Sequence, residues 1–376
     1  MEEPNPPVNE GLDLTTLRGF GKRGSMNSEF FLGECAAMTD ISAMDERGLE
    51  KWLSEPTAAT CETLTRTQGA IAVLGAGGKM GPTLAMMLRK AAPGRTIYAV
   101  SRFSDRQVEA RLRAQGIETV EADLLDESAG DELPDATSVF YLAGMKFGAA
   151  GNQPLTWAMN VYMPALVARR YCQSQVVALS TGNVYPFTSL RGPGSRESDL
   201  PDPMGEYAQS CLGRERIFQF FSERFGTPVT LIRLNYANEP RYGIIVDLTL
   251  RILHDQPIDV AMGAVNLIWQ GDANNYIIGA LGLADSPASV LNVTGPETLA
   301  VRDLATRIGQ RLGRKPRFVS QEAPTALLSD ASACCERFGP PTMGLSAMIE
   351  AIVTWVAAGK RVLGKPTKYD VRDGRF

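Results

Sequence analysis

The stretch AIAVLGAGGKMG at residues 70–81 decides the fold predicted for this chain. Its apolar run, 71–74, predicts a buried strand that stops at a glycine-rich turn, and a helical pattern begins behind it at Pro82. Glycines at 75, 78 and 81 allow a tight turn, a close approach of backbone N–H groups to phosphates, and close packing of the helix on the strand. The free N–H groups at the helix start would face an anion. Taken alone, the turn is equally compatible with dinucleotide binding and with a simple change of chain direction.

The composition is that of a globular protein. The chain has 376 residues, of which 44% are hydrophobic and 21% are charged. A net charge of −4 argues against a nucleic-acid partner. No apolar run approaches the ~18 residues that span a bilayer, and the acidic, proline-rich start is unlike a signal peptide. Membrane partners are therefore not expected.

The cysteines and the single histidine limit which kinds of catalytic and metal site are expected. Six cysteines without CxxC spacing predict free thiols in a reducing, cytoplasmic setting. The single histidine, His254, argues against a histidine-based metal site and against a Ser-His-Asp triad. A Tyr, Lys, Asp, Glu or Cys side chain would then act as the general acid or base, and no metal is expected.

Three regions are expected along the chain. Residues 1–69 predict a polar arm up to about residue 40, then one or two helices from Asp45 to about Arg66. Residues 70–238 alternate strand and helix, which predicts a Rossmann-type, doubly wound parallel sheet with a return segment near 264–285. Residues 239–376 are expected to form mostly a smaller α/β substrate lobe. The predicted strands of the sheet are 70–75, 96–101, 118–122, 138–143, 176–181 and 228–234. In the lobe, helices are predicted near 244–255, 302–312 and 345–358, with short strands near 291–293 and 316–319.

The ends of the second and third predicted strands bear on cofactor choice. An NAD site usually has an acidic residue at the second strand end, where this chain has Ser101 followed by Arg102. A serine–arginine pair suits a 2′-phosphate, so NADP is favoured over NAD, and an exposed loop arginine is the alternative. Asp123, followed by Leu124, either accepts a hydrogen bond from adenine or caps a helix.

Further cofactor contacts are expected at the fourth strand end and in the glycine turn. Leu142, Ala143 and Gly144 would let a cofactor pass close to the backbone. Lys146 either reaches the ribose or nicotinamide end or is a solvated loop lysine. In the turn, Met80 is a candidate backbone contact. Lys79 either adds charge near the phosphates or, as the preferred interpretation, is solvated.

Downstream motifs carry a family resemblance. These are GxxGxxG at 75–81, Asp123-Leu124, Leu142-Ala143-Gly144, Ser180-Thr181-x-x-Val184-Tyr185, Glu197…Pro203…Tyr207, Arg233-Leu234-Asn235, and LNVTGPE at 291–297. In order and spacing, over about residues 70–320, the chain resembles the extended short-chain dehydrogenase/reductase family of nucleotide-sugar epimerases, dehydratases and reductases. The run 143–146 followed by Asn160-Val161 looks most like the UDP-galactose 4-epimerase branch.

The resemblance implies a catalytic Tyr–Lys pair with an upstream Ser or Thr. Tyr207 falls at the acid–base position and Thr181 at the upstream position, but Cys211 stands where the lysine should be. Without that cation a tyrosine with its ordinary pKa near 10 is a poor base at neutral pH. Three readings stay open: Lys146 or, as a weaker candidate, Arg214 replaces the lysine; Tyr207 acts chiefly as a general acid; or the site is catalytically silent. Cys211 is read as a space-filling thiol in preference to a nucleophile.

The resemblance also points to substrate residues. Asn160 matches an asparagine that organises the site, with an ordinary helix residue as the alternative. Tyr185 is expected as a pocket wall, and Asn235 and Arg241 fall where the family lines its substrate cleft. Trp269 either stacks on a sugar or base or lies in the core, and both interpretations stay open.

The function predicted is that of an NAD(P)-dependent oxidoreductase or epimerase. It would transfer hydride to or from a small-molecule sugar or nucleotide-sugar-like substrate, and a homodimer is expected. Gly182 and Asn183 after Thr181 argue mildly against a dehydratase, which would carry an acid–base pair there. The alternative is a catalytically silent NAD(P)-binding sensor or regulatory protein on the same fold.

Overall fold

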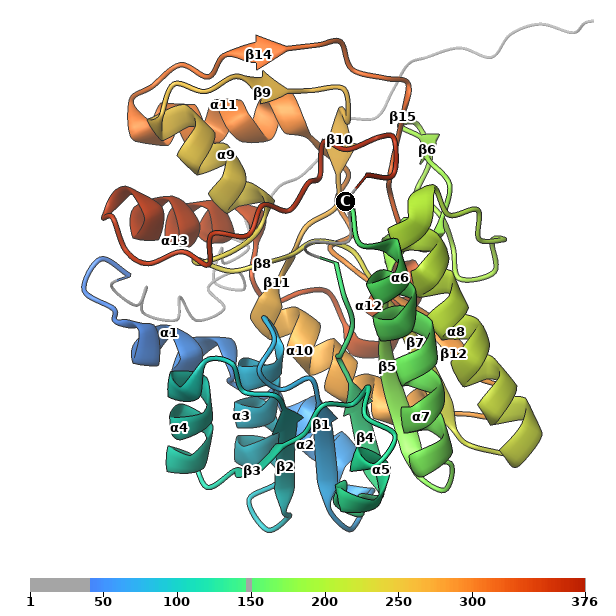
Figure 1. Cartoon of the computed structure of the whole chain (residues 1–376). Helices are drawn as coiled ribbons and strands as arrows, with labels where there is room; N and C mark the ends of the chain where they lie inside the picture. The colour runs from blue at the N-terminus through green and yellow to red at the C-terminus, as the bar shows by residue number, and fades with distance from the viewer. Residues whose placement is uncertain (1–40, 147–150, 376) are drawn as a thin grey trace, which may run out of the picture. The chain divides into compact units, whose positions relative to one another are not determined.

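A seven-stranded parallel sheet lies at the centre of residues 41–146 and 151–375, the part of the chain that the computed structural model describes (Figure 1). Its spatial order is β12-β7-β5-β4-β1-β2-β3. The predicted polar arm up to residue 40 lies outside the described residues. The strands are β1 (Ile71–Leu74), β2 (Ile97–Ser101), β3 (Glu118–Glu121), β4 (Ser138–Tyr141), β5 (Gln175–Thr181), β7 (Val229–Leu234) and β12 (Ser289–Val293).

The strand order reverses at β1, which pairs with β2 on one side and with β4 on the other. Strands β1, β4 and β7 are buried almost throughout because helices cover both faces of the sheet. In such a sheet, ligands bind at the carboxyl ends of the strands, at the point where the order reverses. The predicted glycine turn follows β1 and therefore lies at this point.

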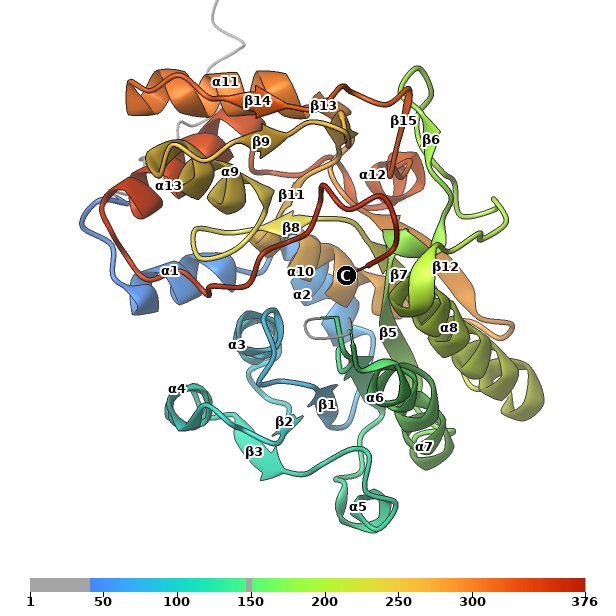
Figure 2. The ribbon, with the colours of Figure 1, turned by 45° about the horizontal axis from the view of Figure 1, so that its top comes forward.

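Two layers of helices cover the sheet (Figures 1 and 2). Side chains of α2 (Ala58–Thr65), α3 (Gly81–Ala91), α4 (Arg106–Ala114) and α10 (Gln270–Gly279) share a core with one face. Side chains of α7 (Met163–Arg170) and α8 (Gly205–Phe225) share a core with the other. Shorter elements on this half are α5 (Ala129–Glu132), α6 (Gln153–Trp157), the π-helix η1 (Ala158–Tyr162), and the 3-10 helices η2 (Gly182–Val184) and η3 (Ala280–Leu283).

One predicted strand belongs elsewhere than expected. The segment near 291–293 was assigned to the second lobe, but β12 pairs in parallel with β7 at the edge of the main sheet, with Leu291 opposite Ile232. The prediction was wrong because pairing with a strand more than fifty residues earlier leaves no signal in the local pattern. The other predicted sheet strands coincide with β1 to β5 and β7 within a few residues.

A second lobe stands above the carboxyl edge of the sheet. Its core is formed by α9 (Ile244–Leu253), α11 (Val301–Leu312) and α13 (Leu345–Ala357), as the helical pattern predicts. The first helix of the described chain, α1 (Glu46–Leu53), inserts Leu49 and Leu53 into this same core. The small elements nearby are β6 (Thr188–Ser189), β8 (Ala237–Asn238), β9 (Ile258–Asp259), β10 (Ala264–Val265), β11 (Ile268–Trp269), β13 (Leu299–Ala300), β14 (Phe318–Val319), β15 (Thr325–Ala326) and α12 (Ser332–Phe338). None of the helices in the described ranges is long and apolar enough to cross a membrane.

After α13 the chain returns as an extended segment, 360–375, which we call the C-terminal strap. It runs from the second lobe toward the start of α8, drawn in dark red in Figure 2. Thr367 donates to Asp247 of α9 through its N–H (2.8 Å) and its hydroxyl (2.6 Å). At its far end Gly374 packs directly against the backbone of Gly205. The strap therefore crosses above the carboxyl edge of the sheet.

Candidate cofactor and active site

Two glycines of the turn after β1, Gly75 and Gly81, have no room for a Cβ atom. A Cβ atom on Gly75, whose φ is +88°, would lie 2.7 Å from the backbone nitrogen of Ala143, and one on Gly81 would lie 2.5 Å from the carbonyl oxygen of Ala76. The helix that follows, α3, starts after Met80 with no side chain capping its N–H groups. A cradle of this kind fits the diphosphate of a dinucleotide, because backbone donors and the helix dipole face an anion together.

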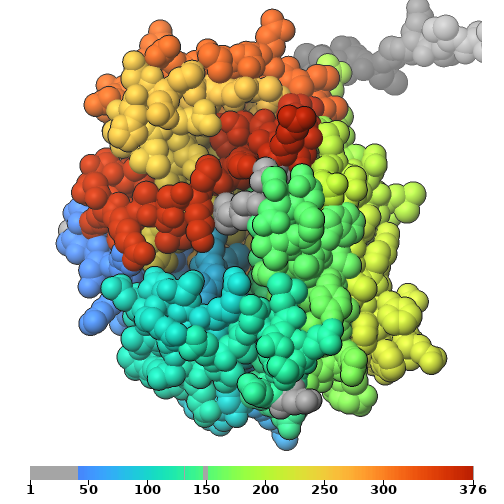
Figure 3. Space-filling view, viewed as in Figure 1, coloured from blue at the N-terminus to red at the C-terminus, as the bar shows by residue number. Residues whose placement is uncertain are grey.

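A cavity of about 210 Å³ opens against this turn. The space-filling view shows the surface hollowed between the dark red strap and the teal and green half of the molecule (Figure 3). The cavity brings together the predicted residues Gly75, Gly78, Lys79, Met80, Gly81, Leu142, Lys146, Thr181 and Tyr207. The other residues that line it are Leu179, Ser180, Leu234, Tyr236, Ala237, Tyr242, Gly243, Ile244 and Thr367, of which Ser180 and Leu234 belong to the motifs quoted above. No group of metal-ligating side chains occurs in the described ranges.

Lys79 reaches across the cavity. Its Nζ donates to the carbonyl oxygen of Ala237 at 2.8 Å and lies 3.7 Å from the ring centroid of Tyr242. Burial lowers the pKa of Lys79 to about 7. Its charged neighbours act in both directions: Glu239 and Asp247 raise the pKa, and Lys146 and Arg241 lower it. The expectation of a solvated lysine was therefore wrong, because the side chain is drawn over a carbonyl and an aromatic face.

The two predicted catalytic hydroxyls meet at the cavity wall. Tyr207 is 8% exposed, and its hydroxyl is hydrogen-bonded to Thr181 and to the thiol of Cys211. Burial raises the pKa of Tyr207 well above its ordinary value; the Cys211 thiol adds to the rise and the nearby Arg214 opposes it. Burial likewise raises the pKa of Cys211. At neutral pH the pair is a phenol beside a neutral thiol.

Arg214, one turn of α8 beyond Cys211, is the buried cation of the site. Its guanidinium donates to the carbonyl oxygen of Leu179 at 2.9 Å and to Oδ1 of Asn160 at 2.5 Å. Gly144 makes room for it, because a Cβ atom there would lie 2.2 Å from Nη2 of Arg214. The space that a lysine at position 211 would need is thus bordered by a guanidinium already in place.

Asn160 organises the loop after β4. It lies fully buried in the π-helix η1, a local widening that often marks functional sites. Its amide accepts from the Met145 N–H (2.8 Å) and donates to the Met145 carbonyl (2.9 Å) and to Ser210 (2.9 Å). The side chain does not line the cavity and so acts by holding the loop that carries Lys146.

Lys146 lines the same cavity as Tyr207. Its Nζ lies 6.0 Å from the ring centroid of Tyr236, and burial lowers its pKa to about 8, with Lys368 lowering it further and Cys211 and Asp247 opposing the shift. The reading of a solvated loop lysine does not match this position.

A buried polar network supports the strand that ends in Thr181. Ser180 donates to Glu215 (2.6 Å), which pairs with Arg233 (2.8 Å), and Arg233 donates to the hydroxyl of Tyr185 (2.7 Å). The same hydroxyl donates to Asn292 of β12 at 2.9 Å. Tyr185 is therefore fixed at its polar end, and its ring borders a second, smaller cavity.

The residues predicted for the adenosine end lie at the ends of β2 and β3, outside the cavity. Arg102 has a side chain 64% exposed, with Nη1 3.7 Å from Asp123 Oδ2. Ser101 lies beneath the glycine turn, since a Cβ atom on Gly77 would lie 2.6 Å from its hydroxyl. Asp123 Oδ1 accepts from the N–H of Leu125 at 3.0 Å. Leu124 is buried in the core, so its role is packing.

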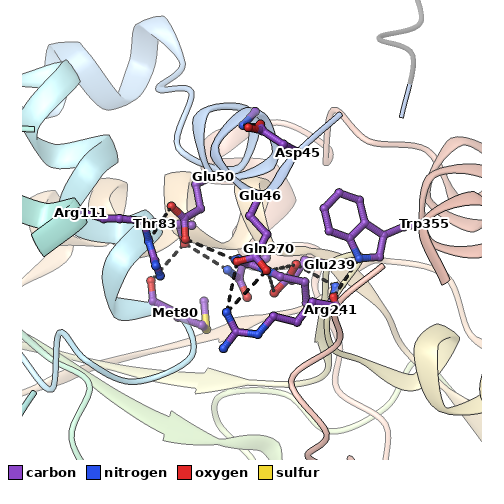
Figure 4. Close-up of polar contacts among 12 residues, drawn as sticks. Asp45, Glu46, Glu50, Met80, Thr83, Arg111, Glu239, Arg241, Gln270 and Trp355 are labelled. Atoms are coloured by element: carbon purple, nitrogen blue, oxygen red, sulfur yellow. Dashed lines mark hydrogen bonds and ion pairs between the residues drawn. The ribbon is translucent and has the colours of Figure 1, made fainter. Parts of the chain in front are cut away.

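Arg241 forms ion pairs inside the fold and does not line the cleft. It is 7% exposed and pairs with Glu239 (3.1 Å) and with Glu50 of α1 (3.3 Å), while Glu50 also pairs with Arg111 of α4 (3.2 Å) (Figure 4). The predicted substrate contact is therefore wrong: the guanidinium is surrounded by carboxylates. The ion pair with Glu50 could not be predicted from the sequence, because Glu50 lies 191 positions from Arg241.

Two other predicted substrate residues also lie in packed surroundings. Trp269 is 3% exposed and packs against Trp52 of α1 with ring centroids 4.8 Å apart. Of the two interpretations left open for Trp269, the structure supports the core. Asn235 is 2% exposed and donates weakly to the carbonyl oxygen of Leu327 at 3.5 Å. Neither residue borders the cavities that hold the predicted site residues.

Solved structures identify the fold. The UDP-glucuronic acid 4-epimerase of Bacillus cereus in complex with NAD is 19% identical, with a TM-score of 0.67, over 77% of this chain and 98% of that one. The chain has the UDP-sugar 4-epimerase fold. MoeE5 in complex with UDP-glucuronic acid and NAD (21%, TM-score 0.65, over 77% and 100% of the chains) and the UDP-glucose 4-epimerase of Thermotoga maritima (18%, 0.64, 77% and 99%) share it. No protein-family model and no curated protein sequence matches the chain.

The epimerase fold confirms the predicted architecture of a Rossmann-type sheet with a smaller second lobe. Sequence reasoning missed the strap residue Thr367 and Tyr236, which also line the cavity. Tyr236 follows the recognised Arg233-Leu234-Asn235 motif, so its position after a strand end was the available signal. No local sequence signal marks Thr367, because it approaches the site from the C-terminal strap.

Proposed function

We propose that this protein is an NAD(P)-dependent oxidoreductase of the extended short-chain dehydrogenase/reductase type, acting on a small molecule with a carbonyl or secondary hydroxyl group. The observation that carries the proposal is the meeting of the Tyr207 and Thr181 hydroxyls on the wall of the cavity that the glycine turn also lines. A nicotinamide bound there would supply or accept the hydride. The likeness to UDP-sugar 4-epimerases makes epimerisation of a nucleotide sugar the neighbouring candidate.

Tyr207 is proposed as the proton donor. Its raised pKa keeps the hydroxyl protonated at neutral pH, which suits the reduction of a carbonyl. The carbonyl carbon then gains a hydride and its oxygen gains the Tyr207 proton, while Thr181 hydrogen-bonds the same oxygen. The tyrosinate left behind is stabilised by the Arg214 cation, which lowers the pKa of Tyr207. It regains a proton from solvent.

Substitution of Tyr207 tests the role of its hydroxyl. In Tyr207→Phe, reduction or oxidation of any accepted substrate should fall by about 10²- to 10⁴-fold, while NADPH binding stays within about twofold. Turnover is followed by NADPH absorbance and binding by fluorescence titration. Tyr171→Phe is the matched control, because it removes a buried hydroxyl bonded to Pro134, away from the cavity. If Tyr207→Phe binds cofactor and turns over like Tyr171→Phe, the proposed proton donor is wrong.

We further propose that NADP is the preferred cofactor. Support comes from Ser101 and Arg102, which stand at the β2 end where a carboxylate would repel a 2′-phosphate. Arg102→Ala should lower the ratio of NADP⁺ to NAD⁺ affinity by about tenfold, the loss of one charge-assisted hydrogen bond. Arg106→Ala is the matched control, because its side chain is equally exposed (63%) but is already paired with Glu121. Equal ratios in the two variants would refute the assignment.

A further inference from the structure

A second cavity, of about 80 Å³, lies next to the first. The two share Tyr236 as a lining residue. Asn183 belongs to the turn that follows Thr181, so the second cavity begins two residues beyond the catalytic hydroxyl. A substrate whose reacting carbon lies beside Tyr207 and Thr181 would extend into this space. The second cavity is therefore the place for the part of the substrate that does not react.

The walls of the second cavity are mainly apolar. They consist of Asn183, Tyr185, Pro186, Phe187, Asp202, Met204, Tyr236, Leu327, Val371 and Gly374. Among these described residues the only formal charge is the carboxylate of Asp202, which would repel a phosphate. The Tyr185 hydroxyl is already engaged by Arg233 and Asn292. The nearest strap cation, Arg372, lies over the Phe187 ring and donates to the Thr325 carbonyl at 2.7 Å.

The C-terminal strap closes this cavity from outside. Val371 packs onto the apolar cluster of Val184, Tyr185, Tyr207 and Cys211, and Gly374 meets the backbone at Gly205. Ion pairing of Asp370 with Arg251 (3.1 Å) and the Thr367–Asp247 hydrogen bonds hold the strap in place. A cavity of this size is far below the ~300 Å³ that a drug-sized ligand occupies. The strap thus limits both the length and the charge of the group that enters.

We propose that the second cavity selects an uncharged, largely apolar ketone or secondary alcohol as the substrate, and that Val371 of the strap sets its size. This inference rests on the proposed oxidoreductase function and departs from the nucleotide-sugar class that the fold alone favours. The diphosphate of a nucleotide sugar is best bound by cations, and the described walls hold one carboxylate, the Asn183 amide, two tyrosines and hydrocarbon, but no cation.

The test compares neutral and charged probes with the full-length protein. Cyclohexanone, acetophenone and 1-phenylethanol are the neutral probes, and UDP-glucose and UDP-glucuronic acid are the charged ones. Binding in the presence of NADP⁺ is measured by saturation-transfer NMR, and turnover is measured with NADPH or NADP⁺ by absorbance. Val371→Trp, which fills the cavity, should raise the KM or Kd of a neutral probe by at least about tenfold and leave cofactor binding unchanged.

Two further variants keep this test decisive. Met204→Trp fills the same cavity from a side chain that is 49% exposed, so it serves if Val371→Trp fails to fold. Val319→Trp, at an exposed position of β14 (43%), is the control, and it should leave the KM or Kd of the neutral probes and the binding of the cofactor unchanged.

Each outcome separates the inference from the proposed function. Turnover of neutral probes that the cavity variants weaken, with no response to UDP-sugars, supports both. Binding of neutral probes that the variants weaken, without turnover, supports the inference and overturns the function. Oxidation or epimerisation of a UDP-sugar overturns the inference and supports the function. Failure of every neutral probe to bind in a Val371-dependent way overturns the inference.

Discussion

Residues of α8 place a small thiol and a guanidinium next to Tyr207. Cys211 is fully buried, and Arg214, one turn further, supplies the positive charge next to Tyr207. A guanidinium keeps its charge at any physiological pH, whereas a buried lysine loses it readily. A lysine at position 211 would bring a second cation against Arg214 in a low-dielectric site, where like charges repel strongly. The small thiol therefore suits the arginine.

The lowered pKa of Lys79 predicts that the affinity for the cofactor depends on pH. Its pKa in the free protein is lowered to about 7, and a diphosphate binds the charged form, so binding must raise that pKa. Affinity is then greatest below about pH 7 and falls as the pH rises. For NAD⁺, whose diphosphate keeps its charge over this range, Kd should rise about tenfold between pH 6 and pH 8.

Calorimetric titration of Lys79→Met checks this expectation. The variant should bind NAD⁺ more weakly at pH 6 and lose most of the pH dependence. Whatever remains reports Lys146, which lines the same cavity and has a pKa lowered to about 8. Lys315→Met, on the exposed surface, should keep the wild-type slope. A slope in Lys79→Met equal to that of the wild type would contradict the role of this lysine.

At the scale of elements, α1 joins parts of the fold that are distant in sequence. Asp45 caps the helix by accepting from the Gly48 N–H at 2.8 Å, and Leu49 and Leu53 are buried in the second lobe. Between them Glu50 is 4% exposed and pairs with Arg111 of the sheet half and with Arg241 below α9 (Figure 4). The helix α1 thus contacts both the sheet half and the second lobe.

Removing the Glu50 charge should destabilise the protein. In Glu50→Gln, the buried guanidinium of Arg241 and the half-buried one of Arg111 lose a carboxylate partner, and breaking a buried pair in this way costs about 3 kcal/mol. The free energy of unfolding is measured by urea titration, and exchange of the α1 amides should increase.

Glu55→Gln is the matched control for α1. Glu55 pairs with Lys90 at 2.9 Å, but its side chain is 66% exposed, so the change should cost less than about 1 kcal/mol. Similar losses of unfolding free energy in the two variants would show that the buried ion pairs of Glu50 do not hold α1 in place.

At the scale of the whole molecule, the C-terminal strap closes the cleft over the carboxyl edge of the sheet. The sheet supplies the glycine turn and Thr181, and Tyr207 lies at the start of α8, while Thr367 and Val371 approach from the strap. The cofactor cradle is therefore built on the rigid edge of the sheet. The substrate wall is built on a segment held by side-chain contacts, which can differ among proteins that share this sheet.

The sequence alone predicted six strands of the sheet, the glycine turn and the two hydroxyls that are proposed as catalytic. Apolar runs of four to seven residues reveal buried strands, and glycines at 75, 78 and 81 reveal a turn without room for Cβ atoms, because both signals are local. The four-residue spacing likewise predicted that Cys211 lies one helical turn beyond Tyr207, on the same face.

Only the tertiary structure decided which charged side chains lie beside Tyr207 and which form ion pairs within the scaffold. Arg241 and Arg214 look alike in sequence, yet the first is enclosed by Glu239 and Glu50 and the second lies beside Tyr207. The same holds for β12, which joins the main sheet, and for Val371, which closes the substrate wall. These placements depend on contacts between residues tens to hundreds of positions apart. No local periodicity records such contacts, because they are set by the packing of whole elements.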